Sequence, residues 1–181
     1  AIMGINPIRY VKKTLEVLIF AFTSRSSAGA LPLNVQTQTQ RLGVPEGIAN
    51  FSASFGLSIG QNGCAGIYPA MLAIMVAPVA HVDIDIPFIL TLIAVVVISS
   101  FGVAGVGGGA TFASILVLST LNLPVALAGV LISIEPIIDM GRTALNVNDS
   151  ILAGTGTARL TGNLDKEKFN SNHYGELSTE S

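Results

Sequence analysis

Residues 135–146 read EPIIDMGRTALN and lie inside a long apolar block near the end of the chain. The polar members Glu135, Asp139, Arg142 and Asn146 are spaced i, i+4, i+7 and i+11, which places them on one face of an α-helix. An ionisable side chain costs about 2.5–3.5 kcal/mol at the centre of a membrane helix, even on a lenient insertion scale. We therefore expect this face to line a polar cavity, where Asp139 accepts an ammonium and Arg142 clamps a carboxylate. The alternative is an ion pair between Asp139 and Arg142 that only joins helices.

The composition of the whole chain is that of a membrane protein. Half of the residues are hydrophobic and 11% are charged, against about 25% charged in ordinary soluble domains. A net charge of -2 with nine scattered Lys and Arg residues argues against a nucleic-acid partner. The single cysteine, Cys64, excludes an intrachain disulfide, and we interpret it as a packing residue. No nucleophile with an adjacent base and no metal-ligand cluster is present, so we do not expect an enzyme.

The sequence divides into four apolar blocks, of which the first three are interrupted by Gly-rich or polar runs and the fourth is continuous. Before them, residues 1–9 are expected to be the end of a preceding helix and a cytoplasmic link. After them, the charged residues 159–181 are expected to form a disordered cytoplasmic tail. The blocks are 10–42 with its break at 24–29, 46–80 with its break at 60–66, 86–121 with its break at 102–109, and 123–158.

The lengths of the block arms decide between spanning and re-entrant helices. A simple crossing needs about 20 apolar residues. At 1.5 Å per residue, the two arms of block 10–42 would be only about 21 and 22 Å long, and those of block 86–121 about 24 and 18 Å. Both blocks therefore fit re-entrant hairpins, whose tips are tolerated at membrane depth where they line a protein cavity. The alternative is a set of ordinary spans with incidental glycines.

The basic residues indicate the orientation of the blocks. Both ends of the first block are basic, at Arg9 and Arg41, so both lie on the cytoplasmic side. The link at 81–85 has no Lys or Arg and is expected outside, whereas Arg159 places the C-terminus in the cytoplasm. The second hairpin then enters from outside. Two halves of opposite orientation with broken helices are the architecture of secondary transporters.

The two hairpin tips are expected to complete the binding site. Ser26 and Ser27 with nearby backbone N–H groups form an anion-receptive end, and Val103 and Gly105 offer backbone groups with few side chains in the way. Close packing of small residues between helices is the alternative explanation of the glycines. For Arg25, in the first tip, three roles stay open: snorkelling, pairing with Glu135, or holding the tip shut.

Three motifs carry a resemblance to a known family. The Arg-Ser-Ser run at 25–27, the Gly-rich run at 102–109, and Asp139 to Thr143 followed by Asn146 resemble the dicarboxylate/amino acid:cation symporters, which include the glutamate transporters. The resemblance implies an all-α membrane fold: the transport-domain core of an elevator transporter, with two re-entrant hairpins of inverted orientation and two crossing helices, one of them broken. It also implies a homotrimer in the cytoplasmic membrane, assembled through a scaffold that precedes this chain.

Residues 58–69, SIGQNGCAGIYP, are similar within that family to bacterial L-cystine uptake transporters. This similarity implies a secondary active symporter that imports L-cystine. As a hypothesis, Asp139 and Asn146 hold one amino-acid end of cystine, Arg142 reaches the distal carboxylate, and Glu135 takes the distal ammonium. A sodium- or proton-coupled symporter of dicarboxylates or acidic amino acids is the alternative, and a channel or a non-transporting subunit is a further one. The implied substrate-binding residues are Ser26, Ser27, Val103, Gly105, Glu135, Asp139, Arg142, Thr143 and Asn146.

The coupling ion stays open between Na⁺ and H⁺, and no other cofactor is expected. Where the sodium-coupled glutamate carriers have Asn-Met-Asp-Gly-Thr, residues 60–64 are GQNGC, so Asn62 replaces a carboxylate. An aspartate that ligates sodium in those carriers aligns with Ser150, although Asp149 is adjacent. Loss of carboxylates weakens a cage of hard oxygen ligands. The candidate cation ligands are Ser58, Gln61, Asn62, Ser100, Asn146 and Asp149.

Overall fold

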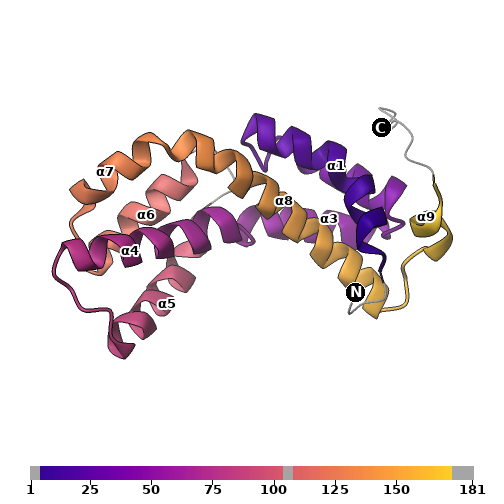
Figure 1. Ribbon diagram of the computed structural model, residues 1–181. Helices are drawn as coiled ribbons and strands as arrows, with labels where there is room; N and C mark the ends of the chain where they lie inside the picture. The colour runs from indigo at the N-terminus through magenta and orange to yellow at the C-terminus, as the bar shows by residue number, and fades with distance from the viewer. Residues whose placement is uncertain (1–4, 104–107, 173–181) are drawn as a thin grey trace.

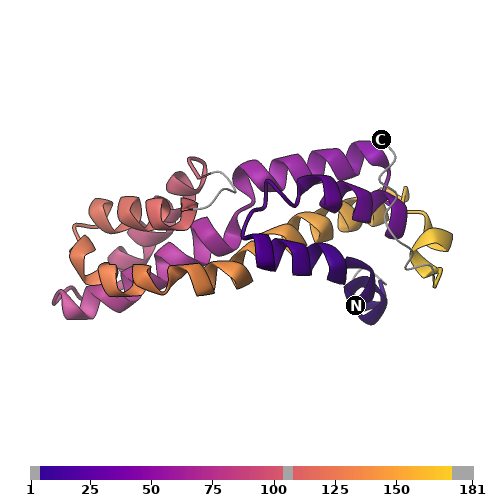
Figure 2. The same cartoon turned by 90° about the horizontal axis from the view of Figure 1, so that it is seen from above.

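Helices make up all of the regular secondary structure in the computed structural model, which describes residues 5–103 and 108–172. The expected all-α fold class is confirmed. A long helix, α8 (Glu135–Leu160), runs along the middle of the molecule (Figure 1). The helices α1 and α3 pack against it towards the C-terminal end, whereas α4 to α7 gather at the other end. The molecule is therefore elongated, with a helical group at each end (Figure 2).

The first helical hairpin consists of α1 (Pro7–Ser24), α2 (Leu31–Gln36) and the π-helical segment η1 (Thr37–Arg41). The side chain of Asn6 accepts two backbone N–H groups at the start of α1, which satisfies donors that have no partner within a helix. At the other end of α1, Arg25 adopts the left-handed conformation with φ 55°. The chain reverses there, at the expected first tip. Its entry into a membrane from one side stays a prediction.

The expected broken helix consists of α3 (Glu46–Ile59), η2 (Asn62–Ile67) and α4 (Tyr68–Val79). The α-helical hydrogen bonding stops at Gly60, and η2 is π-helical, a rare geometry that often marks functional sites. Among the described residues, the stretch Glu46–Val79 is the one that is long and apolar enough to cross a membrane by length and composition.

The second hairpin consists of α5 (Ile86–Ser100) and α6 (Gly109–Thr120), which pack against each other. At the start of α5, Asp85 accepts the backbone N–H of Phe88. The expected tip lies between these two helices, and its residues 104–107, Gly105 included, lie outside the described residues. Neither arm reaches the length of a simple crossing, but the re-entrant path stays a prediction.

The last apolar block is not the continuous helix that the sequence predicted over 123–158. It forms α7 (Val125–Ser133) and α8, with a break at Ile134. The reason is Pro136, which lacks a backbone N–H and whose ring would clash with the carbonyl of residue 132 in a continuous helix. The break makes Glu135 the first residue of α8, where the helix dipole favours a negative charge.

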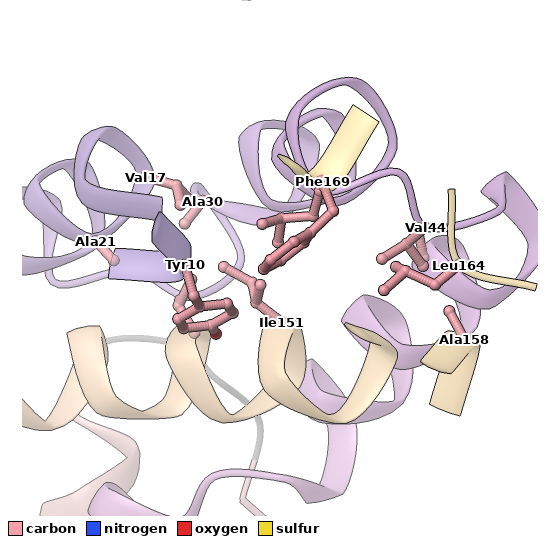
Figure 3. Close-up of a cluster of buried hydrophobic side chains, with 12 residues drawn as sticks. Tyr10, Val17, Ala21, Ala30, Val44, Ile151, Ala158, Leu164 and Phe169 are labelled. Carbon is pink, nitrogen blue, oxygen red and sulfur yellow. The ribbon is translucent and has the colours of Figure 1, made fainter. Parts of the chain in front are cut away.

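The expected disorder of residues 159–181 is also wrong for part of that stretch. A short helix, α9 (Lys166–Asn170), follows α8, and its Phe169 is buried together with Leu164. Figure 3 shows both side chains in a cluster with Tyr10 and Ile151. Composition alone predicted a solvated tail because the two apolar residues are isolated among charged ones. Residues 173–181 lie outside the described residues.

Two apolar clusters lie at the two ends of the molecule. The first is built from α1, α8 and the C-terminal residues, and the second from α4, α5, α6 and α7. Large apolar side chains also cover the outside, with Ile86 77% and Val130 78% exposed. Such a surface suits contact with lipid or with further apolar helices. The buried polar residues of the α8 stripe, from Glu135 to Asn146, lie between the two clusters.

The contact between α3 and α8 gives a test of this packing. A Cβ added at Gly56 would lie 2.5 Å from Cβ of Ser150, whereas one added at Gly47, on the same helix, would meet nothing within 4 Å. We expect Gly56→Ala to destabilise the full-length protein by about 1–3 kcal/mol because overpacking forces the helices apart. Gly47→Ala is the control and should leave the thermal midpoint in detergent unchanged or slightly higher. Equal midpoints for both variants would contradict the close α3–α8 contact.

Candidate functional site

The polar stripe of α8 lies inside the structure. Glu135, Asp139, Arg142 and Asn146 are each 7% exposed or less, and they face the break of the α3–α4 helix and the tip of the first hairpin. Buried ionisable groups are tolerated only where they are paired and hydrogen-bonded. The partners of these four side chains therefore define the site.

Arg142 is the centre of an ion-pair network. Its Nη2 donates to Oε1 of Glu135 at 2.6 Å and to Oδ1 of Asp139 at 3.2 Å. The Nε of Arg25 donates to Oδ2 of Asp139, also at 3.2 Å. Arg25 thus pairs with Asp139, not with Glu135, and ties the first tip to α8. The two guanidinium groups and the two carboxylates balance each other in charge.

Tyr68, the first residue of α4, was not among the expected site residues. Its ring lies under the guanidinium of Arg142, with 3.9 Å between Cζ and the ring centroid, and its hydroxyl donates to the Leu131 carbonyl at 3.4 Å. A cation over an aromatic face is attracted by the ring quadrupole, more strongly when both are buried. In the sequence, the signal for this role is a tyrosine that directly follows the broken segment. The sequence does not determine towards which side of the helix that tyrosine points.

Two donors of Arg142 have no partner among the described residues. Its Nε and Nη1 are buried and make no hydrogen bond. An unsatisfied buried donor costs about 1–3 kcal/mol, and more when it is charged. Such a group in a folded protein calls for an explanation. The arrangement suits an anion, because a free guanidinium N–H makes a charge-assisted hydrogen bond to a carboxylate oxygen.

Asn146 holds the broken segment against α8. Its Oδ1 accepts the backbone N–H of Gly63 at 2.7 Å, and its Nδ2 donates to Oε1 of Gln61 at 3.0 Å and to Sγ of Cys64 at 3.1 Å. A Cβ on Gly63 would lie 2.9 Å from the backbone oxygen of Arg142, so this approach requires glycine. The amide expected to bind a carboxylate is thus engaged within the protein.

Cys64 is more than a packing residue. Its thiol is buried and donates to Oδ1 of Asp139 at 3.7 Å while Sγ accepts from Asn146. It therefore connects the acid that pairs with both arginines to the amide that holds the break. The sequence did not predict this role, because a single cysteine in an apolar block gives no indication of where its side chain points.

The two serines of the first tip have different surroundings. Ser27 is buried, and its hydroxyl donates to Oε1 of Gln61 at 3.4 Å, which joins the tip to the break. The hydroxyl of Ser26 accepts the backbone N–H of Gly29 at 2.9 Å within the tip itself. Thus Ser27, and not Ser26, contacts the group of residues around the α8 stripe.

The remaining expected binding residues lie near this group. Thr143 is buried on α8, next to Arg142 in the chain. Val103, at the base of the second tip, is buried against Ala65 of η2 and Ala113 of α6. The second tip therefore begins beside the broken helix, on the same segment that Asn146 holds.

The six expected cation ligands make hydrogen bonds within the protein, and a cation site formed by them stays a prediction. Gln61 pairs with Asn146, and Nδ2 of Asn62 donates to Oδ2 of Asp149 at 2.9 Å. The hydroxyls of Ser58 and Ser100 each donate to a carbonyl of their own helix. Among the described residues, no group of three or more His, Cys, Asp or Glu side chains could hold a metal.

A small enclosed cavity lies beside Asn146. Its volume is about 10 Å³, which is close to the space that one water molecule needs. Polar side chains from the first hairpin, the break and α8 border it, and Nδ2 of Asn34 donates to Oγ of Ser150 there at 2.7 Å. The polar contacts lining the cavity are those of Ser27, Asn34, Gln61, Asn146 and Ser150.

Comparison with known proteins identifies relatives of this chain. The family model of the sodium:dicarboxylate symporter family matches residues 1–160. The L-cystine uptake protein TcyP of Shouchella clausii is 70% identical over 170 residues, which are 93% of this chain and 36% of that protein. The proteins of the same name from Bacillus licheniformis and Bacillus thuringiensis are 70% and 65% identical, over 92% and 94% of this chain. The chain spans 36% and 37% of these two proteins, so it covers little more than a third of its relatives' length.

The engaged amide of Asn146 leads to a stability prediction. Asn146→Leu removes the acceptor of the Gly63 N–H and the donor to Gln61, and each orphaned buried group should cost about 1–3 kcal/mol. We expect a clear drop in the thermal midpoint of the full-length protein. Asn62→Leu is the control, because Asn62 is exposed and its side chain bonds only to Asp149. A midpoint for Asn146→Leu equal to that of the control would show that Asn146 does not hold the break.

Proposed function

This chain belongs to the sodium:dicarboxylate symporter family, and we propose that the complete protein is a secondary active transporter that imports L-cystine. The observation that carries the proposal is the buried Arg142, which keeps two donors unpartnered beside the carboxylates of Glu135 and Asp139. An amino acid supplies a carboxylate that binds the donors of Arg142 and an ammonium that binds a carboxylate of the stripe. The names of the relatives in three bacteria support cystine as this amino acid.

Binding replaces ion pairs that are already present. The ammonium of one amino-acid end takes the place of the Arg25 guanidinium at Asp139. A substrate carboxylate accepts a hydrogen bond from Nε or from Nη1 of Arg142, the two buried donors of this guanidinium that have no partner among the described residues. Once Arg25 is displaced, the first tip loses its ionic contact with α8. The substrate itself thus becomes the link between the tip and the last helix.

The second amino-acid end of cystine uses Glu135. This carboxylate is at the first residue of α8, 2.6 Å from Nη2 of Arg142. A substrate with one ammonium needs only Asp139, whereas cystine has two ammonium groups on opposite sides of its disulfide. Glu135 is the remaining acid of the stripe and takes the distal one.

The substrate crosses the membrane by the elevator mechanism that the resemblance to the dicarboxylate/amino acid:cation symporters implies. In our proposal the two hairpins enter the cytoplasmic membrane from opposite sides, and the C-terminus lies in the cytoplasm. The parts of the complete protein outside this chain supply the scaffold of a homotrimer. The exposed apolar side chains of α5 and α7 support contact with lipid or with that scaffold.

A symporter of dicarboxylates or acidic amino acids is the second candidate. Arg142 favours it equally, because its unpartnered N–H donors bind any carboxylate. Glu135 distinguishes the two candidates, since a second acid beside the arginine repels the side-chain carboxylate of such a substrate. For either candidate the coupling ion is Na⁺ or H⁺.

Transport by the full-length protein in proteoliposomes tests the proposal. A sodium gradient and a proton gradient are imposed in separate experiments. We expect labelled L-cystine to accumulate with one of the two gradients alone. Arg142→Lys should abolish most of the uptake, because an ammonium lacks the planar, five-donor guanidinium that pairs with Glu135 and Asp139 and still has donors left for a carboxylate. Arg159→Lys, a half-exposed arginine on the same helix, is the control. Accumulation of a dicarboxylate but not of cystine would favour the second candidate, and accumulation of neither would refute both.

The role of Glu135 has its own test. We expect Glu135→Gln to raise the KM for cystine roughly tenfold, which corresponds to one lost charged contact. The KM for a dicarboxylate with one amino group should change much less. Glu16→Gln, which alters an acid that pairs with Arg41 far from the stripe, is the control. An equal change for both substrates would contradict the second ammonium site.

A further inference from the structure

The residues after the last long helix do not leave the molecule. Residues 163–171, which we call the C-terminal strap, run across the base of the first hairpin, where α1 begins and η1 ends. Leu164 and Phe169 are the apolar residues of the strap, and both are buried in the cluster that contains Val17 of α1 and Ile151 of α8 (Figure 3). The strap therefore belongs to the packed structure.

Lys13 of α1 is the polar centre of this contact. The residue is fully buried, and its Nζ donates to the carbonyl of Arg41 at 2.8 Å, to the carbonyl of Lys168 at 2.6 Å and to Oγ of Ser171 at 3.4 Å. An ammonium has three donors, and all three are used. A buried charge is costly unless it is hydrogen-bonded. Lys13 can stay buried only while α1, the end of η1 and the strap remain together.

The backbone at Gly43 is shaped for the same contact. The N–H of Asp165 donates to the carbonyl of Gly43 at 2.9 Å, and Gly43 has a φ of 72°. A Cβ on Gly43 would lie 2.7 Å from the carbonyl oxygen of Asp165, so the strap can approach only a glycine. Two side-chain bonds add to the contact, from Arg9 to Asn170 at 3.0 Å and from Lys168 to the Thr39 carbonyl at 3.3 Å.

From these contacts we infer that the C-terminal strap is a conformational device that holds the first tip closed over the α8 stripe. The strap fixes α1 at its start, and α1 ends at the residue before Arg25, which pairs with Asp139. A helix of 18 residues is about 27 Å long, so a small tilt at its base displaces its far end by several times more than its start. Release of the strap lets α1 tilt, and the tip then withdraws from Asp139 and Gln61. The strap touches no residue of the candidate site.

The test measures the accessibility of Cys64, which is buried beside Asp139. The full-length protein in proteoliposomes is treated with N-ethylmaleimide, and the alkylated Cys64 peptide is quantified by mass spectrometry. We expect Lys13→Met to speed alkylation about tenfold, because charged hydrogen bonds that keep the strap docked are lost. The control is Lys12→Met, which changes an exposed lysine of the same helix and should leave the rate unchanged. Alkylation of a folded Lys13→Met variant at the wild-type rate would overturn the inference.

A cross-link gives a second test, in which a covalent bond replaces the hydrogen bond between Arg9 and Asn170. Arg9→Cys and Asn170→Cys place two exposed or half-exposed thiols on the two sides of the contact, and a short bismaleimide joins them. The cross-link should slow the alkylation of Cys64 below the wild-type rate and restore the wild-type rate in the Lys13→Met background. Cross-linked protein that alkylates as fast as the uncross-linked double variant would refute the device. Since the readout is alkylation, failure of cystine transport would leave this result unaffected.

Discussion

The burial of the Arg142 guanidinium is the constraint on which the rest of the structure depends. A charge in a low-dielectric interior must be balanced by opposite charge and by hydrogen bonds. Glu135 and Asp139 provide the charge from the same helix, and the Tyr68 ring provides a face for the cation. Asp139 in turn draws in Arg25. The network is neutral, and among the described residues it leaves two buried donors of Arg142, Nε and Nη1, without a partner.

Each interruption of a helix supplies some of the charges and hydrogen bonds that balance the buried polar groups. The turn after α1 brings Arg25 to Asp139, and the break after α3 brings the Gly63 N–H and Gln61 to Asn146. The break before α8 places Glu135 at a helix start, where the dipole stabilises its charge. A straight helix would present only side chains to the site, because its backbone groups are already paired. The interruptions therefore free backbone groups and turn side chains inward at one level of the molecule.

The sequence predicted the features that depend on periodicity and composition, and it missed those that depend on rotation and distance. The face shared by Glu135 and Asn146 follows from helical spacing alone. The direction of Tyr68 and Cys64 does not, because Cys64 lies within the π-helical segment η2 and Tyr68 follows it, and the π-helical turn shifts these residues around the axis. The docking of Phe169 also escaped, since a single apolar residue in a charged stretch has no pattern. The site into which Phe169 packs forms only when α1 and η1 have come together.

Charge balance also limits how a coupling ion enters. The network of two arginines and two acids carries no net charge, and cystine is neutral overall, so displacement of Arg25 by cystine leaves the site with one net negative charge. In our proposal a sodium ion balances this charge from a cage of oxygen ligands, to which a carboxylate contributes. Beside the break, Asp149 is the described acid outside the stripe, and it is held by Asn62. A proton needs no new cage, because it can neutralise an acid of the stripe directly. If Asp149 is among the ligands of a coupling sodium ion, its replacement by asparagine abolishes coupled uptake, whereas proton coupling through the stripe leaves it replaceable.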